Sequence, residues 1–143
     1  MTRKVQVWIA LSESQKAVKK VLILKTKPER GGFWQPITGG VDANESLEAA
    51  ALREASEETG LKLEVLGQIK ATGVDFEFQS RWGDQGRVKE SVFLITLTEK
   101  PSKIVLDPKE HIECQWVTPE RAIDMIKFES NKDALRQILK ALQ

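Results

Sequence analysis

The sequence predicts an α/β fold of the mixed (α+β) kind, in a single domain that spans residues 1–143. Length is the first observation behind this prediction, because 143 residues with 41% hydrophobic content suit one core. The second is the order of the patterns, since runs typical of strands and of helices follow one another without strict βαβ alternation. A sheet with both parallel and antiparallel neighbours is therefore expected.

Residues 4–11 and 18–25 are the first two expected strands. Both are rich in aliphatic residues, and the polar residues 12–16 between them favour a hairpin. Residues 27–40 contain two prolines and four glycines and are expected to form a loop. The later strands are expected at 61–71, 75–79, 88–97 and 112–117, with a turn at 80–87.

The clearest helical pattern covers residues 45–59. Asn44 is a suitable N-cap, good helix formers fill the first turns, and Gly60 is the expected stop. A second helix is expected from Pro119 to about residue 128, because a threonine followed by proline is typical of a helix start. A third helix is expected at about 132–142.

Charge, hydropathy and cysteine content argue against several classes of protein. Lys and Arg number 22 and Asp and Glu 21, and a net charge of +1 disfavours a strongly basic nucleic-acid binder. No apolar run approaches the ~20 residues of a membrane helix. The single Cys114 cannot form an internal disulfide, and residues 5–11 fit a strand better than a signal peptide. A cytoplasmic location is therefore expected.

The helix at 45–59 carries a stripe that begins apolar and ends acidic. At the helical period this stripe holds Leu47, Ala50, Ala51, Glu54, Glu57 and Glu58. A second apolar stripe holds Ala49, Leu52 and Ala55, so we expect the helix to be covered on both sides.

Residues 42–60 carry a net charge of −5, which leaves +6 on the rest of the chain. Like charges three and four residues apart cost ~0.2–0.5 kcal/mol per pair, and anions are disfavoured at a helix C-terminus. A solvated acidic face is one explanation. A divalent-cation site is favoured instead, because core residues share the stripe and carboxylate oxygens suit Mg²⁺, with Mn²⁺ as the alternative ion.

These residues resemble the Nudix box. Gly39 is followed by five residues and Glu45, then by seven residues and the run Arg53-Glu54-Ala55-Ser56-Glu57-Glu58-Thr59-Gly60-Leu61. Every fixed position of the pattern is met, with Ala55 as a small member of the aliphatic class. The resemblance implies a Nudix-type α/β/α sandwich around a mixed sheet.

The resemblance also implies roles for individual residues. Glu54, Glu57 and Glu58 match the metal-binding glutamates, and the backbone of Thr38 and Gly39 matches a loop that often joins the metal shell. Arg53 and Glu45 match the pair that braces this loop, and Gly60 supports the end of the box. Glu110, six residues before Trp116, matches an additional metal ligand or general base, with Glu113 as a weaker candidate.

Candidate substrate-binding residues lie just before the box. Lys25, Lys27 and Arg30 are available for phosphates, although solubilising loop charges are the alternative. Trp34 fits either a base-stacking platform or a core residue, and Gln35 and Gly40 belong to the same loop. Trp82, in the predicted turn, is a candidate contact for a substrate or partner.

Nudix enzymes hydrolyse a nucleoside diphosphate linked to another group. The segment Phe33-Trp34-Gln35-Pro36-Ile37-Thr38-Gly39-Gly40 resembles the bacterial dATP and dihydroneopterin triphosphate pyrophosphohydrolases, which release pyrophosphate from a 5′-triphosphate. The branch acting on RNA 5′ ends is the main alternative. Dinucleoside polyphosphate hydrolysis and a non-catalytic nucleotide sensor are less favoured, and a homodimer remains open.

Overall fold

The computed structural model describes residues 1–12, 17–67, 69–80 and 86–142. Most of the turns predicted at 12–16 and 80–87, including Trp82, lie outside these residues. The strands are β1 (Thr2–Leu11), β2 (Lys20–Thr26), β3 (Trp34–Gln35), β4 (Ile37–Gly40), β5 (Ile69–Gln79), β6 (Arg87–Leu97) and β7 (His111–Val117). The helices are η1 (Pro28–Arg30), α1 (Leu47–Thr59), α2 (Leu63–Leu66), α3 (Pro119–Met125) and α4 (Glu129–Ala141).

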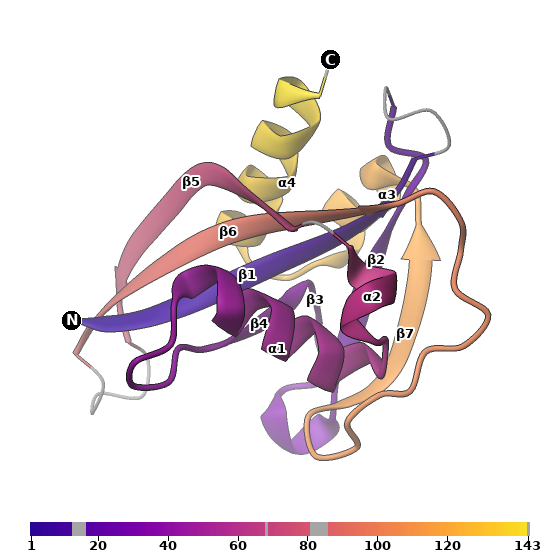
Figure 1. Cartoon of the computed structure of the whole chain (residues 1–143). Helices are drawn as coiled ribbons and strands as arrows, with labels where there is room; N and C mark the ends of the chain where they lie inside the picture. The colour runs from indigo at the N-terminus through magenta and orange to yellow at the C-terminus, as the bar shows by residue number, and fades with distance from the viewer. Residues whose placement is uncertain (13–16, 68, 81–85, 143) are drawn as a thin grey trace.

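The sheet is mixed, as predicted, and β1 lies at its centre. β1 runs parallel to β6 over ten residue pairs, and its last residues pair antiparallel with the start of β2, which confirms the expected hairpin. The main path is β3-β2-β1-β6-β5, with β4 paired to β1 and β7 paired to β2. β4 therefore lies beside β1, and β7 lies beside β2, although a long connection separates β7 from β6 in the chain (Figure 1).

Alternate residues of β1 face opposite sides of the sheet. Val5, Val7 and Ile9 pack in the core cluster that includes the alanines of α1. Trp8 and Ala10 pack in a second cluster with the apolar residues of α3 and α4. Helices α1 and α2 thus cover one face while α3 and α4 cover the other, and the predicted α/β/α sandwich is confirmed (Figure 1).

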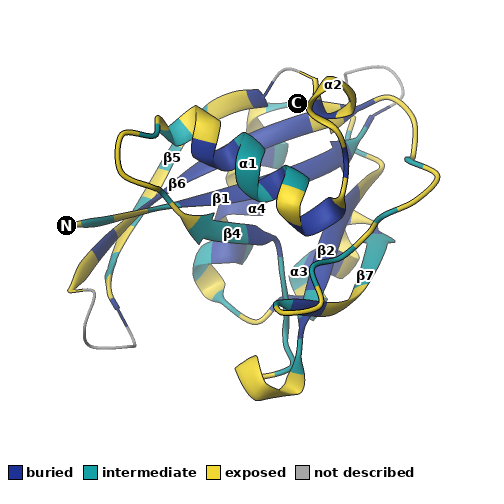
Figure 2. Ribbon diagram, turned by 60° about the horizontal axis from the view of Figure 1, so that its bottom comes forward, coloured by how far each residue is buried: buried dark blue, intermediate teal, exposed yellow. Residues whose placement is uncertain are grey.

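Helix α1 starts and is covered differently from the prediction. Ser46, not Asn44, is the N-cap, because its Oγ accepts a hydrogen bond from the Ala49 amide at 3.0 Å. Asn44 instead adopts a left-handed turn with φ 67°. Covering on both sides was also wrong, since Ala49 is exposed and Leu52 only half-buried, so the helix lies on one sheet face with its outer side in solvent (Figure 2).

Two further segments differ from the prediction. Residues 27–40 are not only a loop, because they contain η1 and the short strands β3 and β4, which pair with strands distant in sequence. The strand expected at 61–71 is replaced at its start by α2, which buries Leu66 under the sheet. β5 then runs without a break through residues 72–74, which separate the strands expected at 61–71 and 75–79, and its register with β6 shifts there. No helix in the described ranges is long and apolar enough to cross a membrane.

Candidate active site

The acidic end of α1 packs against β4. β4 pairs antiparallel with β1, with Gly39 opposite Val5, and this pairing holds the strand beside the helix. A Cβ atom on Gly39 would overlap the Glu54 carboxyl group, whereas the same position on Gly40 faces open space. Glycine at position 39 therefore allows the Glu54 carboxylate to reach the strand backbone.

Arg53 joins the loop after β4 to the helix. Its Nε and Nη2 atoms donate to the two carboxylate oxygens of Glu45 at 2.8 and 2.9 Å, and Nη2 also donates to the Gly40 carbonyl at 2.9 Å. Nη1 donates to Glu54 Oε1 at 3.0 Å. The hydrogen bonds from Arg53 lower the pKa of Glu45 to about 2. The paired hydrogen bonds fix the Arg53 guanidinium and the Glu45 carboxylate relative to each other. The two side chains predicted to brace the loop are thus in direct contact.

The Glu54 side chain is largely shielded from water. Its side chain is 13% exposed, and burial raises its pKa to about 7, partly opposed by the hydrogen bond and charge of Arg53. The charges of the neighbouring carboxylates Glu57 and Glu58 make a smaller contribution to this raised pKa. A carboxylate in such a position is stabilised in its charged form by a cation.

Three of the four predicted metal-binding carboxylates line one cavity of about 290 Å³. They are Glu54, Glu58 and Glu110. The cavity also takes in Thr2, Lys4, Arg30, Thr38, Gly39 and Gly40. The fourth carboxylate, Glu57, is 54% exposed and contacts Arg53 Nη1 at 3.5 Å.

The donor set of this cavity consists of carboxylate and peptide oxygens. Such oxygens suit a hard divalent cation of the Mg²⁺ or Mn²⁺ type, so the residues fit the ion that the Nudix pattern implies. Among the residues that the structure describes, no three His, Cys, Asp or Glu side chains already form a cluster that could hold an ion. Three of the four predicted carboxylate ligands, Glu54, Glu58 and Glu110, are thus neighbours around one cavity.

His111 links two parts of the site. It begins β7, is 3% exposed, and its Nδ1 lies 2.5 Å from Glu58 Oε2. Its Nε2 lies 3.0 Å from Gln35 Nε2. Because a carboxylate only accepts hydrogen bonds and an amide nitrogen only donates them, Nδ1–H donates to Glu58 and Nε2 accepts from Gln35. His111 therefore fixes the side chains of both residues.

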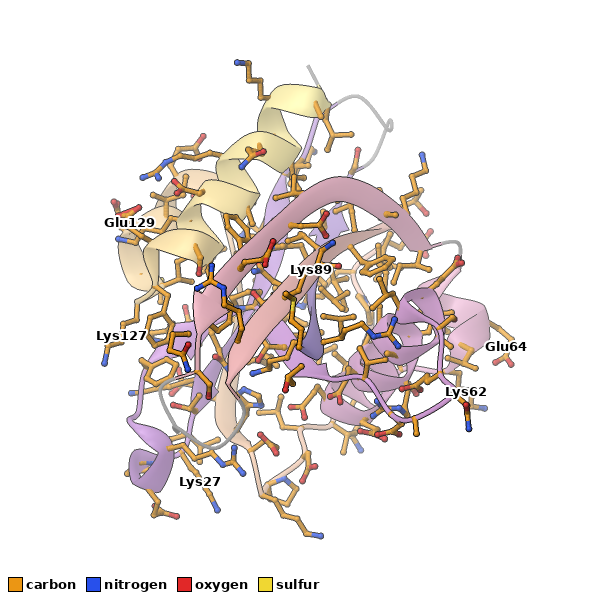
Figure 3. All side chains as sticks on the ribbon, turned by 90° about the vertical axis from the view of Figure 1, so that its left-hand side faces the viewer. Lys27, Lys62, Glu64, Lys89, Lys127 and Glu129 are labelled. Atoms are coloured by element: carbon orange, nitrogen blue, oxygen red, sulfur yellow. The ribbon has the colours of Figure 1, made fainter. Side chains whose placement is uncertain are left out.

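The predicted phosphate-binding cations lie in different surroundings. Arg30 lines the carboxylate cavity and contacts Glu110 at 3.2 Å. Lys25 lies 6.0 Å from the centre of the Trp34 ring, and Trp34 packs against the core cluster beneath α3 and α4. Lys27 contacts Glu29 at 3.7 Å and lies at the edge of the molecule beside η1 (Figure 3).

A second cavity, of about 320 Å³, lies on the α4 side of the sheet. Gln35 and Thr38 line it from β3 and β4, and Lys4 lines it from β1. Its other lining residues are Phe78, Gln79, Ser80, Val88, Glu90, Phe128, Ser130 and Asn131. Lys4 and Thr38 line both cavities, so the two are contiguous around the edge of β1 and β4.

Sequence reasoning missed three residues of this region. Lys4 falls within the strand expected at 4–11, and neither His111 nor Glu90 is among the candidate site residues of the sequence. An acidic residue inside the apolar run 88–97 was the one available signal for Glu90. Nothing local marked His111, because its partner Glu58 is 53 residues away.

Comparisons with known proteins agree with the fold. The NUDIX domain pattern matches residues 2–142. The solved structure of the E. coli dihydroneopterin triphosphate pyrophosphohydrolase has a TM-score of 0.78 at 26% identity, and the match covers 97% of this chain and 95% of that one. The RNA pyrophosphohydrolase of Novosphingobium aromaticivorans is 35% identical over 107 residues, which cover 67% of this chain and 66% of that protein.

An octanoyltransferase of Myxococcus xanthus is 30% identical over 132 residues, or 90% of this chain. The chain spans only 35% of that protein's length. The family pattern, in contrast, runs through almost every element from β1 to α4, and it includes the box that places Glu54 beside Gly39. The chain belongs to the NUDIX domain family.

Proposed function

We propose that this Nudix hydrolase is a divalent-cation-dependent pyrophosphohydrolase. Its substrate is a nucleoside or deoxynucleoside 5′-triphosphate, or another small molecule in which a heterocycle carries a triphosphate. Its products are the monophosphate and pyrophosphate. Water is consumed, and the phosphoanhydride bridge between the α- and β-phosphates breaks. The observation that carries this proposal is the pair of contiguous cavities, one lined by three carboxylates and the other by two phenylalanines among mostly polar side chains.

The two cavities suit the two ends of such a substrate. A cavity of about 320 Å³ lies within the range of roughly 300–1,000 Å³ that is usual for small-molecule sites, and its phenylalanines suit a planar heterocycle. Lys4, at the junction, offers a positive charge to the phosphates that would pass from one cavity to the other. Similarity to the dihydroneopterin triphosphate pyrophosphohydrolase supports a free triphosphate as substrate.

Each group of the carboxylate cavity has a proposed task. Glu54, Glu57, Glu58 and Glu110 would hold the cation together with the backbone of Thr38 and Gly39. When bound, the cation would offset the repulsion between phosphate and the attacking water and lower the pKa of that water. Arg53 keeps the loop and Glu54 in register, and His111 holds Glu58. Arg30 would bind phosphate after leaving Glu110.

The test measures pyrophosphate and phosphate release with Mg²⁺ across a substrate panel. The panel contains the eight common nucleoside triphosphates, dihydroneopterin triphosphate, ADP-ribose, a diadenosine polyphosphate and a short 5′-triphosphate RNA. Pyrophosphate from free triphosphates is the expected result. Turnover confined to the RNA would favour the alternative function, which the similarity to an RNA pyrophosphohydrolase supports.

Glu57→Gln tests the catalytic assignment, because its exposed side chain can be changed with little effect on folding. We expect turnover to fall by at least about 100-fold, the order of loss expected when charge stabilisation of a transition state is removed. Glu48→Gln is the matched control, since Glu48 is exposed on the same helix but lies in its first turn. Equal activity of the two variants would refute the assignment.

A further inference from the structure

The second cavity contains a buried carboxylate that the hydrolytic chemistry does not use. Glu90 lies on β6, is 5% exposed, and lines the cavity on the face of the sheet opposite α1. Burying a carboxylate is unfavourable unless donors surround it, and burial raises the pKa of Glu90, partly opposed by the Gln6 hydrogen bond and by the charge of Lys4, its neighbour across the β1–β6 pair. A charged group in this position therefore calls for a partner that supplies N–H groups.

The protein supplies one such donor and fixes its direction. The Trp8 indole Nε1 donates to Gln6 Oε1 at 2.7 Å, and the Gln6 amide Nε2 donates to Glu90 Oε1 at 2.8 Å. Because an indole N–H can only donate, Gln6 must present its oxygen to Trp8 and its NH₂ group to Glu90. Both Gln6 and Trp8 are completely buried, so this chain is held rigidly by the core.

One donor leaves the carboxylate with unused acceptor positions. Within the described residues, the Gln6 amide is the only group that donates a hydrogen bond to Glu90. The side chain nevertheless faces a cavity of about 320 Å³. Phe78 and Phe128 line the same cavity and could hold a planar ring.

We propose that Glu90 reads the substrate heterocycle through two adjacent N–H groups, and so selects the 2-amino-4-oxopyrimidine edge that guanine and dihydropterin share. This edge carries a ring N–H beside an exocyclic NH₂ group, and a carboxylate can accept from both. Adenine and cytosine each pair a donor with an acceptor on the corresponding edge, and uracil and thymine place two carbonyls around one N–H. Those four bases would leave one Glu90 oxygen facing an acceptor.

This inference rests on the proposed function for the path of the triphosphate from the base cavity to the carboxylates. It is tested separately from turnover by calorimetric binding of GMP, IMP, AMP and dihydroneopterin to the wild-type chain without metal. IMP differs from GMP only by the missing 2-amino group. A bidentate base contact is worth roughly 1–3 kcal/mol, so GMP is expected to bind about 10- to 100-fold more tightly than AMP and measurably more tightly than IMP.

Glu90→Gln supplies the second measurement. A glutamine amide offers one acceptor and one donor, which matches the adenine edge, so the preference for GMP over AMP should fall by about 10-fold or more. Glu77→Gln is the matched control, since Glu77 is exposed on the neighbouring strand β5 and its variant should keep the wild-type preference. Circular dichroism and urea unfolding check that both variants fold.

The outcomes separate the two proposals. If no triphosphate is hydrolysed but GMP or dihydroneopterin still binds more tightly than AMP and IMP, the inference stands and the proposed function fails. Equal binding of GMP, IMP and AMP to the wild type overturns the inference, even if Glu90→Gln does not fold. An unchanged preference in a folded Glu90→Gln variant overturns it as well.

Discussion

The contact between Gly39 and Glu54 makes a sharp prediction about one methyl group. In Gly39→Ala the new Cβ atom would overlap the Glu54 carboxyl group. The carboxyl carbon would lie 2.0 Å from this Cβ, so it must retreat by at least about 1.4 Å to reach ordinary van der Waals contact, which begins at 3.4 Å. It is also tied to Arg53 Nη1, so its movement would disturb the contact between loop and helix.

The magnitude follows from the displacement. A misplacement of about 1 Å at a catalytic group can lower a rate by about 100-fold. Overpacking of this kind usually costs about 1–3 kcal/mol of folding stability, which leaves most of the protein folded. We therefore expect Gly39→Ala to remain folded in urea titrations while its Mg²⁺-dependent pyrophosphate release falls by about 100-fold.

Gly40→Ala is the matched comparison. The substitution is the same and the residue is the next in the chain, but its Cβ would meet no heavy atom within 4 Å. We expect its loss of activity to be at least about tenfold smaller than that of Gly39→Ala. If both folded variants lose activity equally, the close approach of Glu54 is not what requires glycine at position 39.

Two further predictions concern the buried and charged pairs around the site. His111→Ala leaves the Glu58 carboxylate without its donor and opens a small void, so stability should fall by about 2–4 kcal/mol; an unchanged urea midpoint would contradict the role given to His111. Glu45 has a pKa of about 2 in the folded chain against 4.5 ordinarily, so its contribution to stability is present above pH 4.5 and is lost as the pH falls towards 2. Glu45→Gln should therefore flatten the dependence of unfolding free energy on pH in that window, and an identical slope in the variant would show that the Arg53 contact does not lower this pKa.

The elements with strong local patterns were predicted well. Residues 4–11 and 88–97 are long apolar runs, and they became the paired central strands β1 and β6. The end of α1 at Gly60 was predicted from the residue alone, because a glycine adopts the left-handed φ of 71° without strain. Its start was not, because Ser46 and Asn44 are both good caps and only the observed turn decides between them.

Short strands were missed for a different reason. β3 has two residues and β4 has four, so neither carries enough alternation to be seen in the sequence. Both form because partners distant in the chain supply hydrogen bonds, β2 for β3 and β1 for β4. Leu63 to Leu66 reads as a strand by composition, yet it forms α2, whose Leu66 is buried in the cluster under α1.

In the candidate site, too, residues that are close in sequence could be predicted together and residues that are far apart could not. The carboxylates of α1 share one helix and fall into a fixed spacing, so the sequence could assign them together. The second cavity is assembled from β1, β3, β4, β5, β6 and α4, and each element contributes only one to three of its lining residues. No spacing in the chain can reveal such a set. The Nudix box itself covers only residues 39–61, so it contains none of Lys4, Gln6 and Glu90, and the box alone could not point to the second cavity.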